Sequence, residues 1–185
     1  MADHDLLEPP LTPITLTGTD VVLRPWHHDD ASCVIDAATD PRIVEITSVP
    51  TAPDEQAACA FVDRQHDRLR TGAGWALAIE HRGTAVGHIG LWLDAKRHGR
   101  AEIGYWVAPL GRGAGAAASA VRLVTDWAFA TLPLHRIDLF IEPWNTASQR
   151  TAEKAGYQRG PFLERWQVID GTPRDMWAYT RVGDD

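Results

Sequence analysis

Hydrophobic and polar residues alternate along several short stretches of this chain, and between them apolar residues recur at the three- and four-residue steps of helices. The alternating stretches, which predict strands, are residues 19–26, 75–81, 84–94, 101–108, 136–142, 157–169 and 175–182. Helical periodicity covers residues 27–38, 53–70, 117–131 and the segment between Asn145 and Gly156. Asp40 and Pro41 are expected to end the first helix, and Pro53 to lie in the first turn of the second.

The rest of the chain is organised around a strand, a bare loop and a long helix in direct succession. The strand at 101–108 is stopped by Pro109, and residues 111–115 read Gly-Arg-Gly-Ala-Gly before the alanine-rich helix begins. The first turn of a helix carries unpaired N–H groups and a partial positive charge, and glycines let an anion approach the backbone closely. Arg112 adds a formal cation. The pattern therefore predicts a pyrophosphate site at residues 111–117.

Three kinds of phosphate loop differ in spacing. A Walker A loop requires a lysine after its last glycine, and this loop has none. A dinucleotide-binding fingerprint is matched in form by Gly111, Gly113 and Ala116, with Asp138 near the distance of a ribose-binding acid, although Pro109 separates the loop from its strand. This dinucleotide-binding interpretation stays open as a minor alternative.

The third kind is the acyl-CoA loop, with Arg or Gln, two residues, Gly, one residue, and Gly or Ala. Residues 112–117 match it in full: Arg112, Gly113, Ala114, Gly115, Ala116 and Ala117. With this loop the chain resembles the GCN5-related N-acetyltransferase (GNAT) family. Residues 135–163 further resemble the second conserved block of the ribosomal-protein alanine acetyltransferase (RimJ/RimL-like) branch, and the likeness covers roughly residues 75–181.

The resemblance implies an α/β fold with a mixed, mostly antiparallel sheet of about seven strands and helices on both faces. It implies that the strand at 101–108 splays from the one at 136–142, and that the thioester of acetyl-CoA, the co-substrate, lies in the gap, with the pantetheine arm running along residues 105–108. The acetyl group would pass to a primary amine, either a protein N-terminal α-amine or a small-molecule amine, by direct attack in a ternary complex. A non-catalytic CoA-binding module with the same fold is the rival interpretation.

The resemblance also implies roles for individual residues. The cofactor-binding residues would be Tyr105, Trp106, Val107, Arg112, Gly113, Ala114, Gly115, Ala116, Ala117, Asn145 and Ser148. Ser148 would either protonate the departing thiolate or only hydrogen-bond its sulfur, with Tyr105 and Tyr157 as alternative acids. Glu102 would be the general base acting through water, or else a solvated strand carboxylate. Asn145 is equally suited to cap the helix that it precedes.

The strength of base that is needed depends on the acceptor. An α-amine with a pKa of roughly 8 is about one-tenth neutral at pH 7, so its deprotonation costs only about 1.4 kcal/mol, against roughly 4.6 kcal/mol for a lysine. A weak or water-mediated base would therefore suffice for an N-terminus. We expect an oxyanion to be held by a backbone N–H near Val107.

Composition limits the partners and the cellular compartment that can be expected. The net charge of −7 over 185 residues argues against nucleic acid as a partner. Neither Cys33 nor Cys59 has metal or redox spacing, which favours reduced thiols in the cytoplasm and no covalent cysteine intermediate. The acidic, proline-broken start is not a signal peptide, and no apolar run is long enough to span a membrane. The histidines give no metal-binding spacing, and His88 is expected to be mainly a strand residue.

Two expectations concern organisation and one concerns the acceptor side. Residues 1–14 are expected to form a flexible N-terminal arm, and residues 15–185 a single catalytic domain. A homodimer is plausible for the branch, but nothing in the chain establishes it. Among the tryptophans, Trp26, Trp92 and Trp166 are candidates for the wall of an acceptor pocket.

Overall fold

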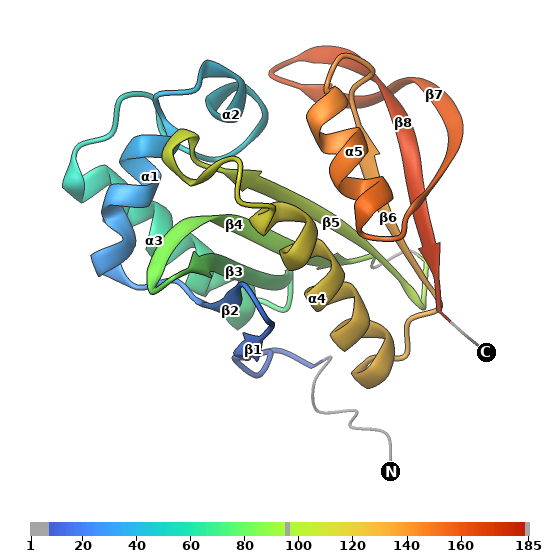
Figure 1. Cartoon of the computed structure of the whole chain (residues 1–185), viewed down its shortest axis with the longest axis horizontal. Helices are drawn as coiled ribbons and strands as arrows, with labels where there is room; N and C mark the ends of the chain where they lie inside the picture. The colour runs from blue at the N-terminus through green and yellow to red at the C-terminus, as the bar shows by residue number, and fades with distance from the viewer. Residues whose placement is uncertain (1–7, 95–96, 184–185) are drawn as a thin grey trace.

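The computed structural model describes residues 8–94 and 97–183, which form one eight-stranded sheet with helices on both faces (Figure 1). The strands are β1 (Leu16–Thr17), β2 (Val22–Pro25), β3 (Gly74–His81), β4 (Thr84–Leu93), β5 (Arg100–Val107), β6 (Arg136–Ile141), β7 (Gln158–Ile169) and β8 (Thr172–Val182). The helices are α1 (Ala31–Ala37), α2 (Pro41–Ile46), α3 (Glu55–Arg70), α4 (Ala116–Thr131) and α5 (Thr146–Lys154), with single 3-10 turns at His28–Asp30 and Pro109–Gly111. The strand order is β1-β2-β3-β4-β5-β6-β8-β7.

The sheet is antiparallel except at its centre, where β5 and β6 run parallel. These two strands pair only at their beginnings, through Arg100–Arg136, Ala101–Ile137 and Glu102–Asp138. Beyond Glu102 and Asp138 the two strands continue without pairing with each other, and Figure 1 shows them diverging toward the end where α5 and α2 lie. The splay implied by the family resemblance is therefore present, and it leaves one edge of β5 without a neighbouring strand.

Two hydrophobic clusters hold the helices to opposite faces of the sheet. The larger cluster joins α4 and α5 to the sheet, and small α4 residues such as Ala120 and Ala128, both fully buried, let the helix lie close to the strands. The second cluster joins α1 and α3 to the other face around Trp26, Phe61 and Trp106. The expected α/β architecture is confirmed, with eight strands where about seven were expected, because the two residues of β1 pair with β2.

Helix α2 was missed by the sequence pattern. Asp40 and Pro41 do end α1, but they also begin α2: the Asp40 side chain accepts a hydrogen bond from the Arg42 N–H, and Pro41 occupies the first turn. The prediction for Pro53 was wrong by two residues, since α3 begins at Glu55 after its cap Asp54. Asp54 supplies the acceptor that proline lacks, which is why the helix begins there.

The predicted N-terminal arm lies partly outside the described residues. Within it, Leu11 is 2% exposed, and its N–H donates to the Leu69 carbonyl at the end of α3 at 3.0 Å. The indole of Trp75 donates to the Thr12 carbonyl at 3.0 Å. These contacts attach residues 11–12 to the domain. In the described ranges, no helix has the length and apolarity needed to cross a membrane.

Candidate active site

The glycine loop leads into α4 in a conformation that only glycine adopts easily. Gly113 and Gly115 have φ values of +89° and +75°, and Gly115 is the N-cap of α4. A Cβ added at either glycine would meet no atom within 4 Å. The first turn of α4 therefore opens onto unobstructed space, and its N–H groups are available to an anion there.

A cavity of about 380 Å³ lies in front of this loop, between α4, α5, β5 and α2. We call it the cofactor-side cavity. Of the predicted cofactor-binding residues, all but Ala114 line it: Tyr105, Trp106, Val107, Arg112, Gly113, Gly115, Ala116, Ala117, Asn145 and Ser148. Ala114 is exposed in the loop, outside this lining. The structure thus brings together residues more than thirty positions apart in the chain.

Arg112 makes contacts within the protein at the mouth of this cavity. Its Nε donates to the Val107 carbonyl at 3.1 Å, and its Nη2 pairs with the Asp40 carboxylate at 2.6 Å. This hydrogen bond from Arg112 lowers the pKa of Asp40 below its ordinary value, with a smaller opposing effect from burial. The arginine therefore joins the end of β5 to the start of α2 and has half of its side chain exposed.

The edge of β5 that has no neighbouring strand faces the gap between β5 and β6. The Ala108 N–H donates to Val86 on the β4 side at 2.9 Å. Because peptide groups alternate in direction along a strand, the N–H groups of Tyr105 and Val107 point away from β4, toward the gap between β5 and β6. A bound chain can pair with these groups as a further strand would.

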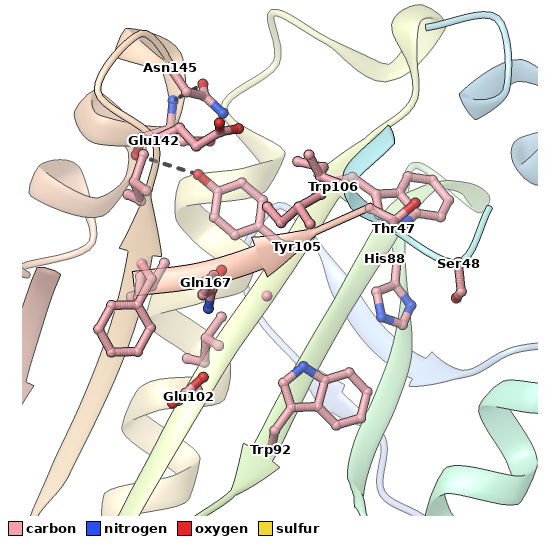
Figure 2. Close-up of a pocket in the computed structure, with 18 of the residues that line it drawn as sticks. Thr47, Ser48, His88, Trp92, Glu102, Tyr105, Trp106, Glu142, Asn145 and Gln167 are labelled. Atoms are coloured by element: carbon pink, nitrogen blue, oxygen red, sulfur yellow. Dashed lines mark hydrogen bonds between the residues drawn. The ribbon is translucent and has the colours of Figure 1, made fainter. Parts of the chain in front are cut away.

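A second cavity, of about 430 Å³, lies on the other side of the gap and is called here the acceptor-side cavity (Figure 2). Residues from the loop after α2 and from α3, β4, β5, β6, β7 and β8 line it. The two cavities share five lining residues: Ile46, Tyr105, Trp106, Asn145 and Ser148. They therefore meet where β5 leaves β6.

Tyr105, Asn145 and Ser148 are linked at this junction. The Tyr105 hydroxyl donates to the Ser148 carbonyl at 3.4 Å, and burial raises the pKa of Tyr105 above its ordinary value. The Asn145 side chain accepts a hydrogen bond from the Ser148 N–H at 3.1 Å, so Asn145 caps α5 as its position predicted. These contacts fix the start of α5 beside the unpaired edge of β5.

Glu102 lines the acceptor-side cavity and is the last residue of β5 that pairs with β6 (Figure 2). It is half-buried, and its pKa is raised, first by burial and then by the carboxylates of Asp94 and Asp138, while Arg97 opposes the shift. No salt bridge within 4.0 Å joins Glu102 to Arg100 or to any other described residue. A carboxylate with a raised pKa can accept a proton close to neutral pH.

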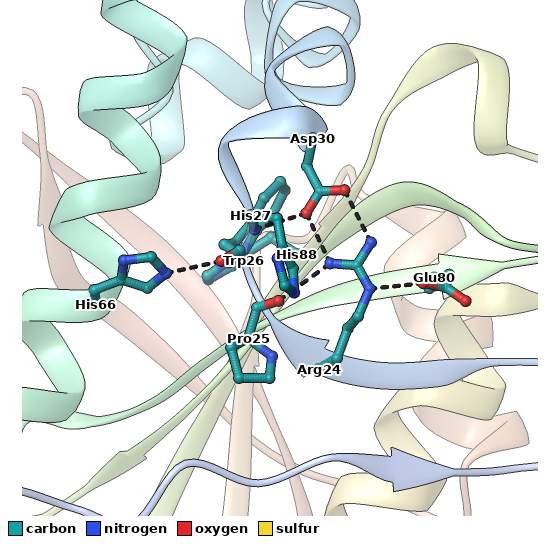
Figure 3. Close-up of polar contacts among 8 residues, drawn as sticks. All are labelled: Arg24, Pro25, Trp26, His27, Asp30, His66, Glu80 and His88. Atoms are coloured by element: carbon teal, nitrogen blue, oxygen red, sulfur yellow. Dashed lines mark hydrogen bonds and ion pairs between the residues drawn. The ribbon is translucent and has the colours of Figure 1, made fainter.

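An aromatic cluster under this cavity contains His88, whose place the sequence did not reveal. Trp26, Phe61 and Trp106 surround the imidazole. The Trp26 indole donates to His88 Nδ1 at 3.2 Å, and Figure 3 draws these two side chains. Burial, with a smaller effect of Arg68, lowers the pKa of His88 to about 3. His88 is therefore neutral. Of the predicted wall tryptophans, Trp92 lines the cavity, whereas Trp26 lies beneath it and Trp166 packs on Phe140.

A model of the acetyltransferase (GNAT) domain matches residues 20–158 of this chain. The chain belongs to the GNAT acetyltransferase family. N-acetyltransferase p20 of Bacillus licheniformis is 26% identical over 171 residues, which cover 90% of this chain and 94% of that protein. Mycobacterium smegmatis RimJ, solved with CoA-disulfide, is similar to this chain with a TM-score of 0.78 and 26% identity, covering 92% of this chain and 88% of that one. RimL, a ribosomal L7/L12 α-N-protein acetyltransferase solved with coenzyme A, has the same fold, with a TM-score of 0.77, 15% identity, and coverage of 92% and 99%.

The family decides between an acetyltransferase and a dinucleotide-binding domain. This GNAT protein is an acetyl-CoA-dependent N-acetyltransferase, so the dinucleotide-binding alternative is wrong. Structural relatives bind coenzyme A. Within the described residues, neither Cys33 nor Cys59 lines either cavity, and burial raises the pKa of the Cys33 thiol to about 12. Tyr157 lies in the core, where its hydroxyl bonds to Thr125, and lines neither cavity.

Proposed function

We propose that this GNAT enzyme binds acetyl-CoA in the cofactor-side cavity and transfers the acetyl group to a primary amine that enters through the acceptor-side cavity. The observation that carries the proposal is that the two cavities meet at Tyr105 and Ser148, beside the unpaired edge of β5. A thioester held at this junction would be reached by an amine from the opposite side of the sheet. Direct attack in a ternary complex is then the simplest route.

The cofactor would be held mainly by the backbone. Its pyrophosphate would lie in the open space before Gly113 and Gly115 and accept hydrogen bonds from the first N–H groups of α4. Its pantetheine arm would pair with the edge of β5 at Tyr105 and Val107. The Val107 carbonyl already accepts a hydrogen bond from Arg112, so we infer that Arg112 shapes this end of the strand as well as adding positive charge.

The reaction needs one proton acceptor and one proton donor. Glu102, acting through water, would take the proton from the ammonium form of the acceptor, which its raised pKa favours near neutral pH. The amine nitrogen then bonds to the thioester carbon, and an N–H at the edge of β5, that of Val107 or Tyr105, stabilises the oxyanion. As the carbon–sulfur bond breaks, the thiolate takes a proton from Ser148 or from a water that Ser148 holds, and the second proton that the attacking nitrogen loses restores this donor.

The acceptor would be a peptide N-terminal α-amine or a small-molecule amine. Glu102 lines the acceptor-side cavity without an ion pair within 4.0 Å among the described residues, whereas Glu142 there pairs with Arg174 at 3.4 Å, and an uncompensated carboxylate favours a cationic group over a neutral one. RimL acts on the N-terminus of a ribosomal protein, as its name states, and by analogy an α-amine is our first candidate. Two free thiols agree with a cytoplasmic location, which we also propose.

A thiol-release assay with acetyl-CoA and a panel of amines tests the proposal. The panel should contain peptides with different first residues, amino acids, polyamines and aminoglycosides, with calorimetric titration of CoA alongside. We expect micromolar CoA binding, as is common for enzyme substrates, and turnover with at least one class of amine. CoA binding without thiol release above the hydrolysis rate for any amine would overturn the proposal and leave a CoA-binding module.

A further inference from the structure

Three hydrogen-bond donors in the acceptor-side cavity have no partner within the described protein: the guanidinium of Arg68, the Nε2–H of His88 and the indole N–H of Trp92. We propose that these three side chains form a subsite for an anionic oxygen group, a carboxylate or a phosphate, that the acceptor carries close to its amine. The inference rests on the proposed function. It concerns the part of the acceptor that does not react.

The orientation of the His88 proton follows from its neighbour. The indole of Trp26 is only a donor, so His88 Nδ1, at 3.2 Å, must be the acceptor. A neutral imidazole has one proton, which is then on Nε2. His88 is only 7% exposed, and the only fully buried side-chain nitrogen or oxygen without a partner in the described ranges is Arg174 Nε, so His88 Nε2 reaches open space. That space is the cavity His88 lines.

Trp92 is held in place by two glycines. A Cβ at Gly90 would lie 2.1 Å from the Trp92 ring, so the indole can lie across β4 only because Gly90 has no side chain. A Cβ at Gly104 would lie 3.5 Å from Trp92 Nε1, which puts the indole N–H over β5. Gly104 is two residues from Glu102 and on the same face of the sheet, as their partners Gly90 and Trp92 are. The proposed subsite is therefore close to the proposed base.

Arg68 supplies the charge. Its guanidinium lies 4.7 Å from the centre of the Trp92 ring, and it has no ion pair within 4.0 Å among the described residues. Burial, and to a smaller extent the nearby Arg64, lower the pKa of Arg68, as expected for a cation with no carboxylate beside it. An anion from the acceptor would compensate this charge, and the neutral donors His88 and Trp92 would complete its hydrogen bonds.

The test compares matched pairs of acceptors that differ only in the anionic group. Glycine and glycinamide, β-alanine and its amide, γ-aminobutyrate and its amide, and phosphoethanolamine and ethanolamine are assayed for kcat/KM with acetyl-CoA. Because the amines of a pair differ in intrinsic reactivity, the readout is the change in the anionic-to-neutral ratio on mutation. We expect Arg68→Gln to lower this ratio about 10- to 100-fold for the pair that fits best, the range for one desolvated charged hydrogen bond.

Arg70→Gln is the matched control, because Arg70 also lies on α3, does not line the cavity, and pairs with Asp67 at 3.1 Å. It should leave every ratio within about twofold. His88→Phe, which keeps a ring but removes the donor, should lower the ratio about threefold to tenfold. If Arg68→Gln does not fold, Arg68→Lys, with charge but no planar fork, should give an intermediate ratio.

The outcomes separate this inference from the proposed function. Turnover by the wild-type enzyme with ratios that Arg68→Gln and Arg68→Lys leave unchanged for every pair would overturn the subsite alone. Absence of turnover with every amine, in these pairs and in the wider panel, would overturn the proposed function and the subsite with it. A fall of the anionic-to-neutral ratio for the phosphate pair only, or for a carboxylate pair only, would support the subsite and identify its anion.

Discussion

The two cavities that meet at the centre of this enzyme are built in different ways. At its glycine-loop end the cofactor-side cavity is lined by consecutive residues, since the loop and the first turn of α4 are one continuous segment. The acceptor-side cavity takes its polar side chains from separate elements, with Arg68 on α3, His88 on β4, Glu102 on β5 and Gln167 on β7. In the proposed function, a backbone site for a constant cofactor is thus combined with a side-chain site that can vary with the acceptor.

The largest effect should come from the acceptor side. Glu102→Gln keeps the shape of the side chain but removes the proposed base, and we expect kcat to fall about 100-fold or more, the usual range for a general base. The base must be ionised, and the pKa of Glu102 is raised, so wild-type kcat should fall with decreasing pH at a higher pH than an ordinary glutamate would give. That limb of the pH profile should be absent in the variant.

Glu80→Gln is the control for this prediction. Glu80 is also a half-buried glutamate within a strand, but it pairs with Arg24 at 2.6 Å and lines neither cavity. Its kcat and pH profile should be those of the wild-type enzyme, measured below the melting temperature of each variant. If Glu102→Gln retained both the wild-type kcat and the acidic limb, Glu102 would be only a strand carboxylate.

A smaller effect should arise on the cofactor side. Gly115→Val puts a branched side chain into the open space before α4, and we expect the Kd for CoA to rise about 30-fold, while the KM for the amine changes little. Gly171→Val is the control, because Gly171 also has a left-handed φ, of +72°, and open space around its Cβ position, but lies in the β7–β8 turn. Both variants should lose similar thermal stability, and equal CoA affinity in the two would contradict the pyrophosphate site.

The contrast between the cavities also explains what the sequence could predict. Strand alternation, the glycines and the Asn145 cap are local signals, and they correctly predicted the strands around the site, α4 and the start of α5. Helix α2 was missed because an Asp-Pro pair such as Asp40 and Pro41 can mark either the end of one helix or the start of the next. His88 gave no signal because its neighbours Trp26 and Trp106 are distant in the chain. The available signal was that His88, Gly90 and Trp92 are every second residue of one predicted strand. This spacing puts the imidazole and the indole on the same face of the sheet, with only a glycine between them.

The junction of the cavities should show an intermediate effect. Ser148→Ala removes a hydroxyl near the expected position of the sulfur but keeps the Ser148 N–H that bonds to Asn145, so α5 should stay capped. We expect kcat to fall about tenfold, as for the loss of one hydrogen bond made in the transition state, with the Kd for CoA within about twofold. Thr146→Ala, at the exposed first residue of α5, should change neither. Wild-type kcat in Ser148→Ala would assign protonation of the thiolate to Tyr105 or to water.

The smallest effect tests how Arg112 acts. In the structure its guanidinium pairs with Asp40, and half of the side chain is exposed, so the pair itself contributes little to stability. If Arg112 leaves Asp40 to meet the pyrophosphate, Asp40→Asn should lower the Kd for CoA by about twofold to threefold, because a competing carboxylate is removed, whereas Arg112→Ala should raise it by about threefold to fivefold. If Arg112 acts only by holding the Val107 carbonyl and α2, both substitutions should weaken CoA binding. Calorimetric titration of the two variants at low and high salt distinguishes these cases, since only direct phosphate contact predicts opposite signs that shrink as ionic strength rises.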